Sequence, residues 1–290
     1  MSYLLHPEMF GQVPLQGERI AGLIDEQADD IALQHHFMDP NTETKEPSLT
    51  VAIRTLNEAD SLQKLLVDIG RQSFDGEVEI IVVDNESTDD TAGVAKEFGA
   101  NVVTLPRDDF TYPRSMNLAM DAASHDAVFL TVGHANLSNT QTWRGGLRHF
   151  QVVNQGGAFA GTLPNTSASW IDKWVIASTA PLFKEPREVS KVGIGVLGAT
   201  NAIVSKRAWL DVDRFDEAYE SGGEDTALAK KMLAAGYHIV REPLLAVHHS
   251  HDLGTFDSAK QWMHWWRTVY SPGKLDKSAL AARRPDIDFS

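Results

Sequence analysis

The chain has 290 residues, a formal net charge of −14 at neutral pH and no cysteine. Its length fits one large domain or two small ones, and its hydrophobic content of 42% and charged content of 23% are typical of a globular protein. The acidic balance argues against nucleic acid as a main partner, because phosphate binding depends on clustered lysine and arginine. The lack of cysteine excludes both a disulfide and a thiol nucleophile.

The two ends of the chain differ from its middle. Residues 1–47 are mixed and acidic, which predicts an N-terminal extension with a linker. The N-terminus lacks the basic start and apolar core of a signal peptide, and no apolar run reaches the roughly 18 residues of a membrane span, so we expect a cytoplasmic protein. Residues 256–290 are predicted to form an aromatic helical tail. The tail contains three tryptophans close together, Trp262, Trp265 and Trp266. We expect them to pack in the core or at a homodimer contact, and peripheral membrane docking is the alternative.

Strand and helix patterns alternate over residues 49–132. Apolar strands are predicted at 49–55, 78–84, 101–105 and 127–132. Leu62, Leu65, Leu66 and Ile69 follow the spacing of one helical face. A second helix is predicted to open at Ser87, with Asp90 three residues on as in a capping box, and to stop at Gly99. A third is marked by small and apolar residues over 116–123.

The second half is less regular. Helices are predicted at 143–150, 170–178 and 224–236, and strands at 156–163, 200–206, 237–240 and 244–249. Residues 181–199 are predicted to be a long loop. Continuous apolar strands separated by helices predict a mostly parallel central sheet covered by helices on both faces. In such sheets ligands bind at the carboxyl ends of the strands.

Polar side chains follow the first two strands where each one ends. Thr55, Asn57 and Glu58 come after the first strand, and Asp84 and Asn85 end the second. Turn and cap chemistry accounts for either group alone. Together they predict a polar shelf that hydrogen-bonds a base and a ribose.

Four motifs in order carry a family resemblance: "VAIRTLNEADSLQKLL", "EIIVVDNESTDDT", "YPRSMNLAM" and "GGEDTALAKKM". Over residues 48–255 the chain resembles the family 2 nucleotide-sugar glycosyltransferases, and it is most similar to the rhamnosyltransferase-like members. The resemblance implies a GT-A fold with a nucleotide-binding half, 48–138, and an acceptor and catalytic half, 139–255.

The resemblance also implies roles for single residues. Thr55, Asn57, Glu58, Asp84 and Asn85 would bind the nucleotide of the donor, Arg114 would lie near its diphosphate, and Asn117 would lie behind Arg114.

The resemblance departs from the family pattern at "GHAN". The family places metal-binding carboxylates where this chain has Gly133 and His134, followed by Asn136. We expect Gly133 and His134 to face the donor. His134 and Asn136 would bind a divalent cation together with His249 or His251, and imidazole ligands favour Mn²⁺ over Mg²⁺. The alternative is that these histidines bind the diphosphate without a metal.

Glu224 and Asp225 follow two glycines at the start of a predicted helix. Acidic residues are favoured at helix N-termini, so capping alone accounts for them. The resemblance implies more: Asp225 would be the base that deprotonates the acceptor hydroxyl, and Glu224 would position acceptor or base.

The leading hypothesis is an inverting glycosyltransferase that moves a sugar from a nucleotide-diphosphate sugar to the hydroxyl of a glycan or small acceptor, in glycan or polysaccharide synthesis. A non-catalytic scaffold with the same fold is the alternative, motivated by the missing carboxylates. A sugar nucleotidyltransferase ranks last, because residues 51–60 lack a glycine-rich phosphate loop.

Overall fold

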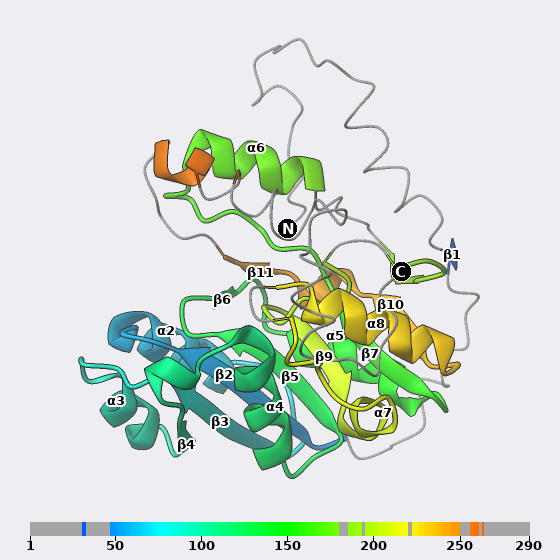
Figure 1. Ribbon diagram of the computed structural model, residues 1–290, viewed down its shortest axis with the longest axis horizontal. Helices are drawn as coiled ribbons and strands as arrows, with labels where there is room; N and C mark the ends of the chain where they lie inside the picture. Colours follow the sequence, from blue (N-terminus) through cyan, green and yellow to red (C-terminus); the bar gives the residue numbers. More distant parts are fainter. Residues whose placement is uncertain are drawn as a thin grey trace.

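The computed structural model describes residues 31–32, 47–179, 185–192, 195–219, 222–249, 256–260 and 263. Its centre is a nine-stranded sheet with the order β1-β8-β10-β7-β9-β5-β2-β3-β4 (Figure 1). The strands of this sheet are β1 (Ile31–Ala32), β2 (Leu49–Thr55), β3 (Val78–Asp84), β4 (Asn101–Thr104), β5 (Ala127–Val132), β7 (Gln155–Phe159), β8 (Arg187–Glu188), β9 (Ala202–Ser205) and β10 (His238–Arg241). A second, two-stranded sheet pairs β6 (Asn136–Leu137) with β11 (Val247–His248).

Helices connect and cover these strands. The α-helices are α2 (Ala59–Gly70), α3 (Thr91–Glu97), α4 (Tyr112–Ala122), α5 (Thr142–Leu147), α6 (Trp170–Thr179), α7 (Lys206–Asp211) and α8 (Glu224–Ala234). Short 3-10 helices are η2 (Arg107–Asp109), η3 (Arg148–Gln151) and η4 (Pro243–Leu245). Among the described residues, none of the helices is long and apolar enough to cross a membrane.

The sheet is mixed, and the part built from residues 49–132 is parallel. Strands β4, β3, β2 and β5 pair in parallel. Strand β9 runs antiparallel to both β5 and β7, whereas β10 is parallel to β7. The parallel half matches the predicted alternation of strands and helices. The antiparallel strand β9 lies where the sequence pattern becomes irregular.

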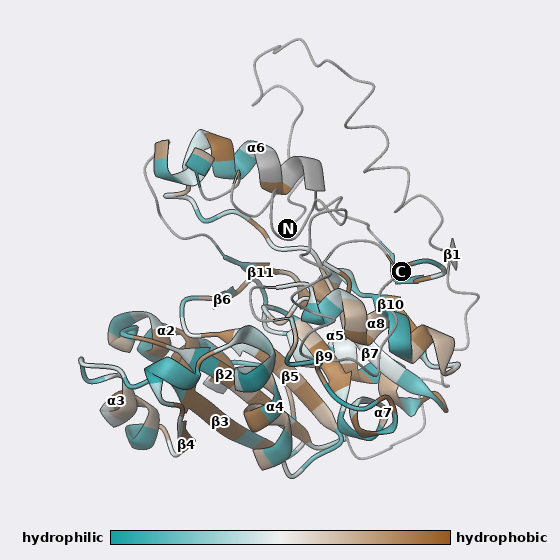
Figure 2. Ribbon diagram, in the orientation of Figure 1, coloured by the Kyte–Doolittle hydropathy of each residue, from teal (hydrophilic) through white to brown (hydrophobic). Residues whose placement is uncertain are grey.

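Alternate residues of the central strands build two separate cores. Leu49, Val51 and Ile53 of β2 pack with Leu62 and the other apolar residues of α2. Ala52, one position along the same strand, packs in a cluster with residues of α4, α7 and α8. Because successive side chains of a strand point to opposite faces, one apolar strand serves both cores. Figure 2 shows the resulting hydrophobic strands beneath more polar helix surfaces.

Helix α3 begins later than predicted. It starts at Thr91, and its N-cap Asp90 makes no side-chain capping bond. The Ser87 hydroxyl instead accepts a hydrogen bond from the backbone N–H of Asn57, at 2.8 Å, so residues 87–90 are a loop. The predicted stop is confirmed, because Gly99 follows the helix with a positive φ of 77°.

The sequence prediction was wrong or incomplete at several places outside the parallel part of the sheet. The predicted strand 244–249 is divided between η4 and β11, and α7 was not predicted. The predicted loop 181–199 contains the short strand β8. This strand pairs with β10 and with β1, so two residues of the predicted N-terminal extension belong to the sheet.

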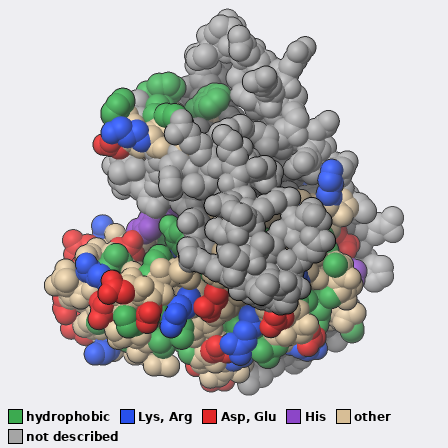
Figure 3. Space-filling model, viewed as in Figure 1, with side chains coloured by type: hydrophobic (Ala, Val, Ile, Leu, Met, Phe, Trp, Pro, Cys, Tyr) green, Lys and Arg blue, Asp and Glu red, His purple; other side chains and the backbone are tan. Residues whose placement is uncertain are grey.

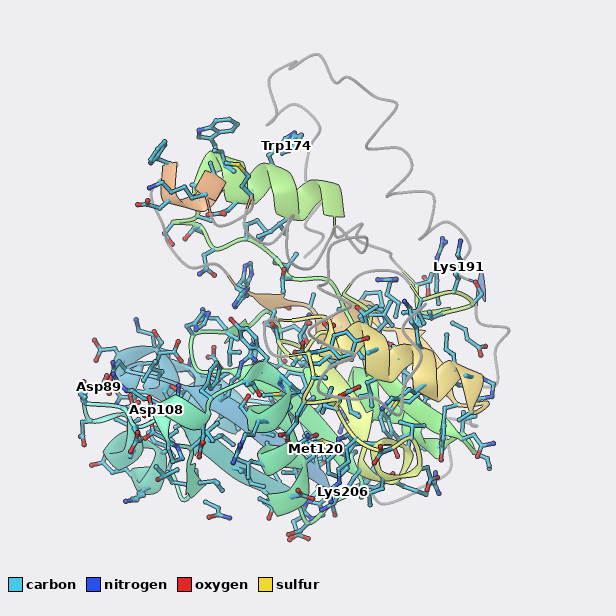
Figure 4. All side chains as sticks on the ribbon, in the orientation of Figure 1. Asp89, Asp108, Met120, Trp174, Lys191 and Lys206 are labelled. Carbon is cyan, nitrogen blue, oxygen red and sulfur yellow. The ribbon has the colours of Figure 1, made fainter. Side chains whose placement is uncertain are left out.

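Helix α6 lies above the sheet together with the start of the C-terminal tail (Figure 1). The Ser258 hydroxyl donates to Asp172 of α6 at 2.9 Å. Trp170 is 67% exposed and Phe256 72% exposed, and apolar side chains gather at this end of the molecule in Figure 3. Figure 4 shows Trp174 on the same helix, away from the sheet. The predicted contacts of Trp262, Trp265 and Trp266 lie outside the described residues.

Candidate active site

The carboxyl ends of β2, β3 and β5 meet at one edge of the sheet. Thr55 pairs with Asp84, and Arg54 pairs with Val132. The chain continues the pairing one residue further: the Gly133 N–H donates to the Arg54 carbonyl at 3.0 Å. Three segments that the sequence separates by up to 80 residues therefore form one site, as predicted from the parallel strands.

Asp84 and Asn85 offer unused acceptors at this edge. Both are buried, and the Oδ1 atom of each has no hydrogen-bond partner among the residues that the structure describes. The other carboxylate oxygen of Asp84 accepts from the Ser87 N–H at 3.2 Å, which fixes the carboxylate in place. Buried polar atoms without partners cost free energy and are uncommon in folded proteins. These two atoms are therefore suited to receive the donor groups of a ligand.

Asn57 shapes the loops around the site. It has a positive φ of 55°, and its Oδ1 accepts from the Thr88 N–H at 2.7 Å and from the Thr88 hydroxyl at 3.1 Å. The side chain therefore joins the loop after β2 to the loop after β3. Asp89, labelled in Figure 4, accepts a hydrogen bond from the Ala59 N–H at 3.1 Å. This bond is a second connection between the segment after β2 and the loop after β3.

Glu58, His134 and His249 form a connected chain of side chains. The Thr55 hydroxyl donates to Glu58 Oε2 at 2.9 Å. Glu58 Oε1 lies 2.5 Å from His134 Nδ1, and His134 Nε2 lies 2.9 Å from His249 Nε2. Because the Glu58 carboxylate can only accept a hydrogen bond, Nδ1 of His134 carries the proton in this contact. The other ring nitrogen, Nε2, is the one that faces His249.

Gly133 is required by close packing. A Cβ atom at this position would lie 2.4 Å from Glu58 Oε2 and 2.7 Å from Thr55 Oγ1. Only glycine lets Glu58 pass beneath the strand end to reach His134. The N–H of Gly133 is bonded to Arg54, so the structure supports a packing role for this residue and offers no N–H to a diphosphate.

The small sheet of β6 and β11 brings the two histidines together. His248 pairs with Asn136, which places His249 beside the loop that carries His134. His249 lies just after β11 rather than within a strand. His251 lies outside the described residues, so its predicted pairing with His249 stays a prediction. No group of three or more His, Asp or Glu side chains suited to a metal occurs in the described part of the chain.

Two glycines with positive φ angles, 125° at Gly222 and 97° at Gly223, turn the chain into helix α8. Glu224 and Asp225 are its first two residues. Asp225 Oδ1 accepts from the Thr226 N–H at 2.5 Å, as expected for an acid at a helix N-terminus.

The two carboxyl groups of α8 are perturbed by burial and by each other. Burial and the charge of Asp225 raise the pKa of Glu224 to about 7. Within the described part of the chain, Glu224 Oε2 is buried without a hydrogen-bond partner. Burial also raises the pKa of Asp225, while hydrogen bonds from Thr226 and the charge of Arg54 oppose the rise. A buried pair of carboxyl groups with perturbed pKa values is typical of acid–base chemistry.

Arg54 belongs to this site and was not predicted. It shares the face of β2 that packs toward α4 and α8, and its guanidinium lies 4.6 Å from the ring centroid of Tyr112. Its charge interacts with Glu224 and Asp225. The signal in the sequence is one arginine in an otherwise uncharged strand, Leu49–Thr55.

The two other predicted donor contacts, Arg114 and Asn117, both lie on α4. Asn117 is buried, and its side chain donates to the Phe215 carbonyl at 3.0 Å and accepts from the Trp209 indole at 3.2 Å. Its polar atoms are thus used within the fold, which favours a role in holding α4 to the segment after α7. Arg114 is half-exposed at the start of α4 and lies 3.7 Å from Asp109.

The structure is an α/β fold with a candidate ligand site at the carboxyl ends of parallel strands and a buried carboxyl pair at the start of α8. Residues 50–201 match the family model described as glycosyl transferase family 2. The chain belongs to this family and is a glycosyltransferase. This finding decides against the nucleotidyltransferase and scaffold alternatives.

Two curated relatives cover most of the chain. It is 23% identical over 236 residues to the O-antigen chain rhamnosyltransferase WbaN of Salmonella anatum, covering 75% of this chain and 74% of the relative. It is also 23% identical over 234 residues to the O-antigen chain rhamnosyltransferase RfbN of Salmonella typhimurium, covering 74% of each. These matches confirm the resemblance to rhamnosyltransferase-like members.

Solved structures share the fold. The mannosyltransferase PcManGT from Pyrobaculum calidifontis, in complex with GDP-Man and Mn²⁺, superposes with a TM-score of 0.60 at 14% identity, covering 93% of this chain and 71% of that one. TarS 1–349 of S. aureus, in complex with UDP-GlcNAc, gives a TM-score of 0.56 at 18% identity, covering 71% of this chain and 59% of that one. At these identities the likeness confirms the GT-A fold.

Proposed function

We propose that this glycosyltransferase binds a nucleotide-diphosphate sugar at the ends of β2 and β3 and transfers the sugar with inversion to a hydroxyl of a growing glycan. The observation that carries the proposal is the convergence of two sets of groups. Buried, unpaired acceptors at Asp84 and Asn85 lie at the same sheet edge as the chain Glu58–His134–His249. The rhamnosyltransferase relatives support a deoxyhexose donor and a polysaccharide acceptor.

Asp84 and Asn85 would bind the base and ribose through their free oxygens. Thr55, Asn57 and Glu58 support this surface from the neighbouring loop, and their own hydrogen bonds hold its shape. Arg114, which is half-exposed at the start of α4, would meet the diphosphate.

The histidines fit a divalent cation. A metal-bound histidine usually donates its other ring nitrogen to a carboxylate, and His134 makes this contact with Glu58. The two Nε2 atoms are 2.9 Å apart, close to the separation of about 3 Å expected for two adjacent ligands with bonds of about 2.1 Å at right angles. Asn136 could add an oxygen, and His251 is the remaining candidate ligand.

A divalent cation held by these residues would neutralise charge on the donor's diphosphate and so make it a better leaving group. Imidazole nitrogen suits Mn²⁺ better than Mg²⁺, which prefers oxygen. This preference is supported by the Mn²⁺ in the complex of the mannosyltransferase neighbour.

Asp225 would serve as the base. Its carboxylate takes the proton of the acceptor hydroxyl while the oxygen bonds to the anomeric carbon and the bond to the diphosphate breaks. One displacement of this kind inverts the anomeric centre. Gly198 lies close to the base, since a Cβ at this position would be 3.7 Å from Asp225 Oδ2, so the loop around Gly198 would border the acceptor.

A thermal-shift panel of UDP, GDP and dTDP, each with Mn²⁺, with Mg²⁺ and with EDTA, tests the proposal. Ligand at 100 times its Kd stabilises the folded state by about 2.7 kcal/mol. We expect one nucleotide to raise the melting temperature, with a larger rise in Mn²⁺. A rise in melting temperature that is equal in EDTA would contradict the metal site. It would instead support histidines that bind the diphosphate without a metal. No rise with any nucleotide would contradict the proposed donor site.

A further inference from the structure

The loop of residues 195–201 lies at the same edge of the sheet as the candidate site. It leads directly into β9, whose first residue, Ala202, pairs with Leu130 of β5 and with Phe159 at the end of β7. Because β9 runs antiparallel to both strands, the loop before it stands at their carboxyl ends. The sheet therefore brings this loop to the edge where the candidate site residues meet.

The loop is fixed in an unfavourable backbone conformation. Leu197 is fully buried and has a φ of 61°, a region that bulky residues rarely adopt. Its side chain packs closely on β7, since a Cβ at Gly157 would lie 2.6 Å from Leu197 Cδ2, and it shares a hydrophobic cluster with Leu228 of α8. The Asn201 side chain donates to the Gly161 carbonyl at 3.1 Å. Such conformations persist where the surroundings fix them, and they cluster at functional sites.

Gly198, the next residue, lies beside the proposed base. A Cβ at this position would be 3.7 Å from Asp225 Oδ2 and 3.4 Å from the Gly195 carbonyl oxygen, which are ordinary contacts. Its φ is not in the left-handed region. Backbone conformation and protein packing thus leave room for a side chain at Gly198, in contrast to Gly133, where a Cβ would collide with Glu58.

The space beside Asp225 matters for the acceptor. Asp225 Oδ1 accepts a hydrogen bond from the Thr226 N–H, and Oδ2 is the oxygen near Gly198. A base has to come within about 2.6–3.2 Å of the hydroxyl oxygen whose proton it takes. Carbon atoms in contact stay about 3.5–4.0 Å apart. A methyl group at position 198 would therefore crowd the carbon that carries the acceptor hydroxyl, whereas a water molecule has no such carbon.

We propose that Gly198 is a specificity-determining residue, and that the hydroxyl-bearing carbon of the acceptor occupies the space beside Asp225 Oδ2 that a side chain would fill. The inference rests on the proposed function, because it takes Asp225 to be the base and a sugar ring to carry the hydroxyl. Leu197 holds Gly198 at this distance. In the transfer the acceptor oxygen bonds to the anomeric carbon, its proton passes to Asp225, and the diphosphate leaves with the electron pair of the broken bond.

The test compares a carbon-bearing acceptor with water. Gly198→Ala adds one methyl group beside the base, and Gly198→Val fills more of the space. The matched control is Gly70→Ala, because Gly70 ends α2 and a Cβ there would meet no atom within 4 Å. Sugar transfer to methyl glycosides and hydrolysis of the donor by water are measured with the same donor, and nucleoside diphosphate affinity is measured by calorimetry.

The two reactions should respond differently. Gly198→Ala should lower kcat/KM for the methyl glycoside by about 5–150-fold, the effect of inserting a methyl group into a filled space, and keep hydrolysis and nucleotide affinity within about twofold of wild type. Gly198→Val should lower transfer further, and Gly70→Ala should change neither reaction. Melting temperatures at or above the wild-type value are expected for both alanine variants, because replacing glycine at a compatible position restricts the unfolded chain.

Two outcomes would overturn the inference. Unchanged transfer to methyl glycosides in Gly198→Ala and Gly198→Val would show that the acceptor does not use this space. Equal losses of transfer and hydrolysis would show that the added side chain disturbs the base itself. If the valine variant does not fold, the alanine variant decides. Failure of the proposed function looks different: the wild-type protein would bind no nucleoside diphosphate or transfer to no glycoside, or Asp225→Asn would keep the wild-type rate.

Discussion

Replacing Glu58 with glutamine tests the proposed metal site without touching a ligand. Glu58 Oε1 lies 2.5 Å from His134 Nδ1, and its other oxygen accepts from Thr55 at 2.9 Å. Glu58→Gln keeps the size and the Thr55 contact. It exchanges the charged acceptor facing His134 for a neutral one, so the ring of His134 is less well oriented.

The expected loss follows from these contacts. A hydrogen bond to a charged group contributes about 1.5–3 kcal/mol and a neutral one about 0.5–1.5 kcal/mol, so the exchange costs roughly 1–2 kcal/mol. Removing the outer partner of a metal-bound histidine typically lowers metal affinity by about 10–100-fold, which corresponds to about 1.4–2.8 kcal/mol. The two estimates overlap, and we expect a loss of about tenfold in Mn²⁺ affinity.

The assay is calorimetric titration of Mn²⁺ into the protein with a saturating nucleoside diphosphate. Glu77→Gln is the matched control, because Glu77 also lies near a histidine, 4.0 Å from His125, but its side chain is 72% exposed. An Mn²⁺ affinity in Glu58→Gln equal to that of the control would refute the assignment of His134 as a ligand supported by Glu58.

Four further predictions follow from single residues. Asp84→Ala should weaken nucleotide binding by about 1.5–3 kcal/mol in calorimetry, because a charged acceptor is lost. Asp225→Asn should lower kcat by about 10²–10⁴-fold while donor affinity is retained. Glu224→Gln should raise the free energy of unfolding above pH 7 by on the order of 3 kcal/mol and leave it unchanged below pH 4, as measured by denaturant titration at both pH values. Asn117→Ala should lower that free energy by about 2–4 kcal/mol, because Trp209 and the Phe215 carbonyl lose their partners, without changing donor affinity.

The sign of the Glu224 prediction follows from linkage. Its pKa in the folded state is raised to about 7 from an ordinary value of 4.5. The folded state therefore binds more protons between these values, and stability falls as the pH rises through that window. Glutamine has no such dependence, so a stability difference that is constant from pH 4 to 8 would contradict the raised pKa.

Clear results would also contradict the other three. Unchanged nucleotide affinity in Asp84→Ala would remove Asp84 from the donor site. A wild-type rate of sugar transfer in Asp225→Asn would show that Asp225 is not the base. A drop in donor affinity in Asn117→Ala, at temperatures where the variant is folded, would show that Asn117 contacts the donor after all.

The local pattern determined much of the first half of this protein. Leu62, Leu65, Leu66 and Ile69 form one buried face of α2, as their spacing predicts. The strand ends meet at one edge because parallel strands present their carboxyl ends together, so the grouping of Thr55 with Asp84 could be read from the sequence. Apolar periodicity suffices here, since each element has a simple position in the sheet.

Prediction from local sequence was wrong or incomplete where the hydrophobic pattern is weak. The antiparallel strand β9 and the helix α7 lie in the half where the hydrophobic pattern is short and irregular, and the sequence gives no indication of strand direction. Ser87 and Asp90 have the spacing of a capping box, but Asn57 from another loop binds Ser87 and the helix starts at Thr91. A tertiary hydrogen bond displaced the local one.

The sequence by itself determined the class of fold, the sheet edge where the candidate site residues meet and the acids at the start of α8. Only the tertiary structure decided the partners. His134 and His249 are 115 residues apart, and they meet because β6 pairs with β11. Arg54 packs on Tyr112 because its position in β2 points it to the α4 side, whereas its neighbour Thr55 points to Glu58. Periodicity predicts which side of a strand a residue takes, but it does not predict which distant group the fold will place there.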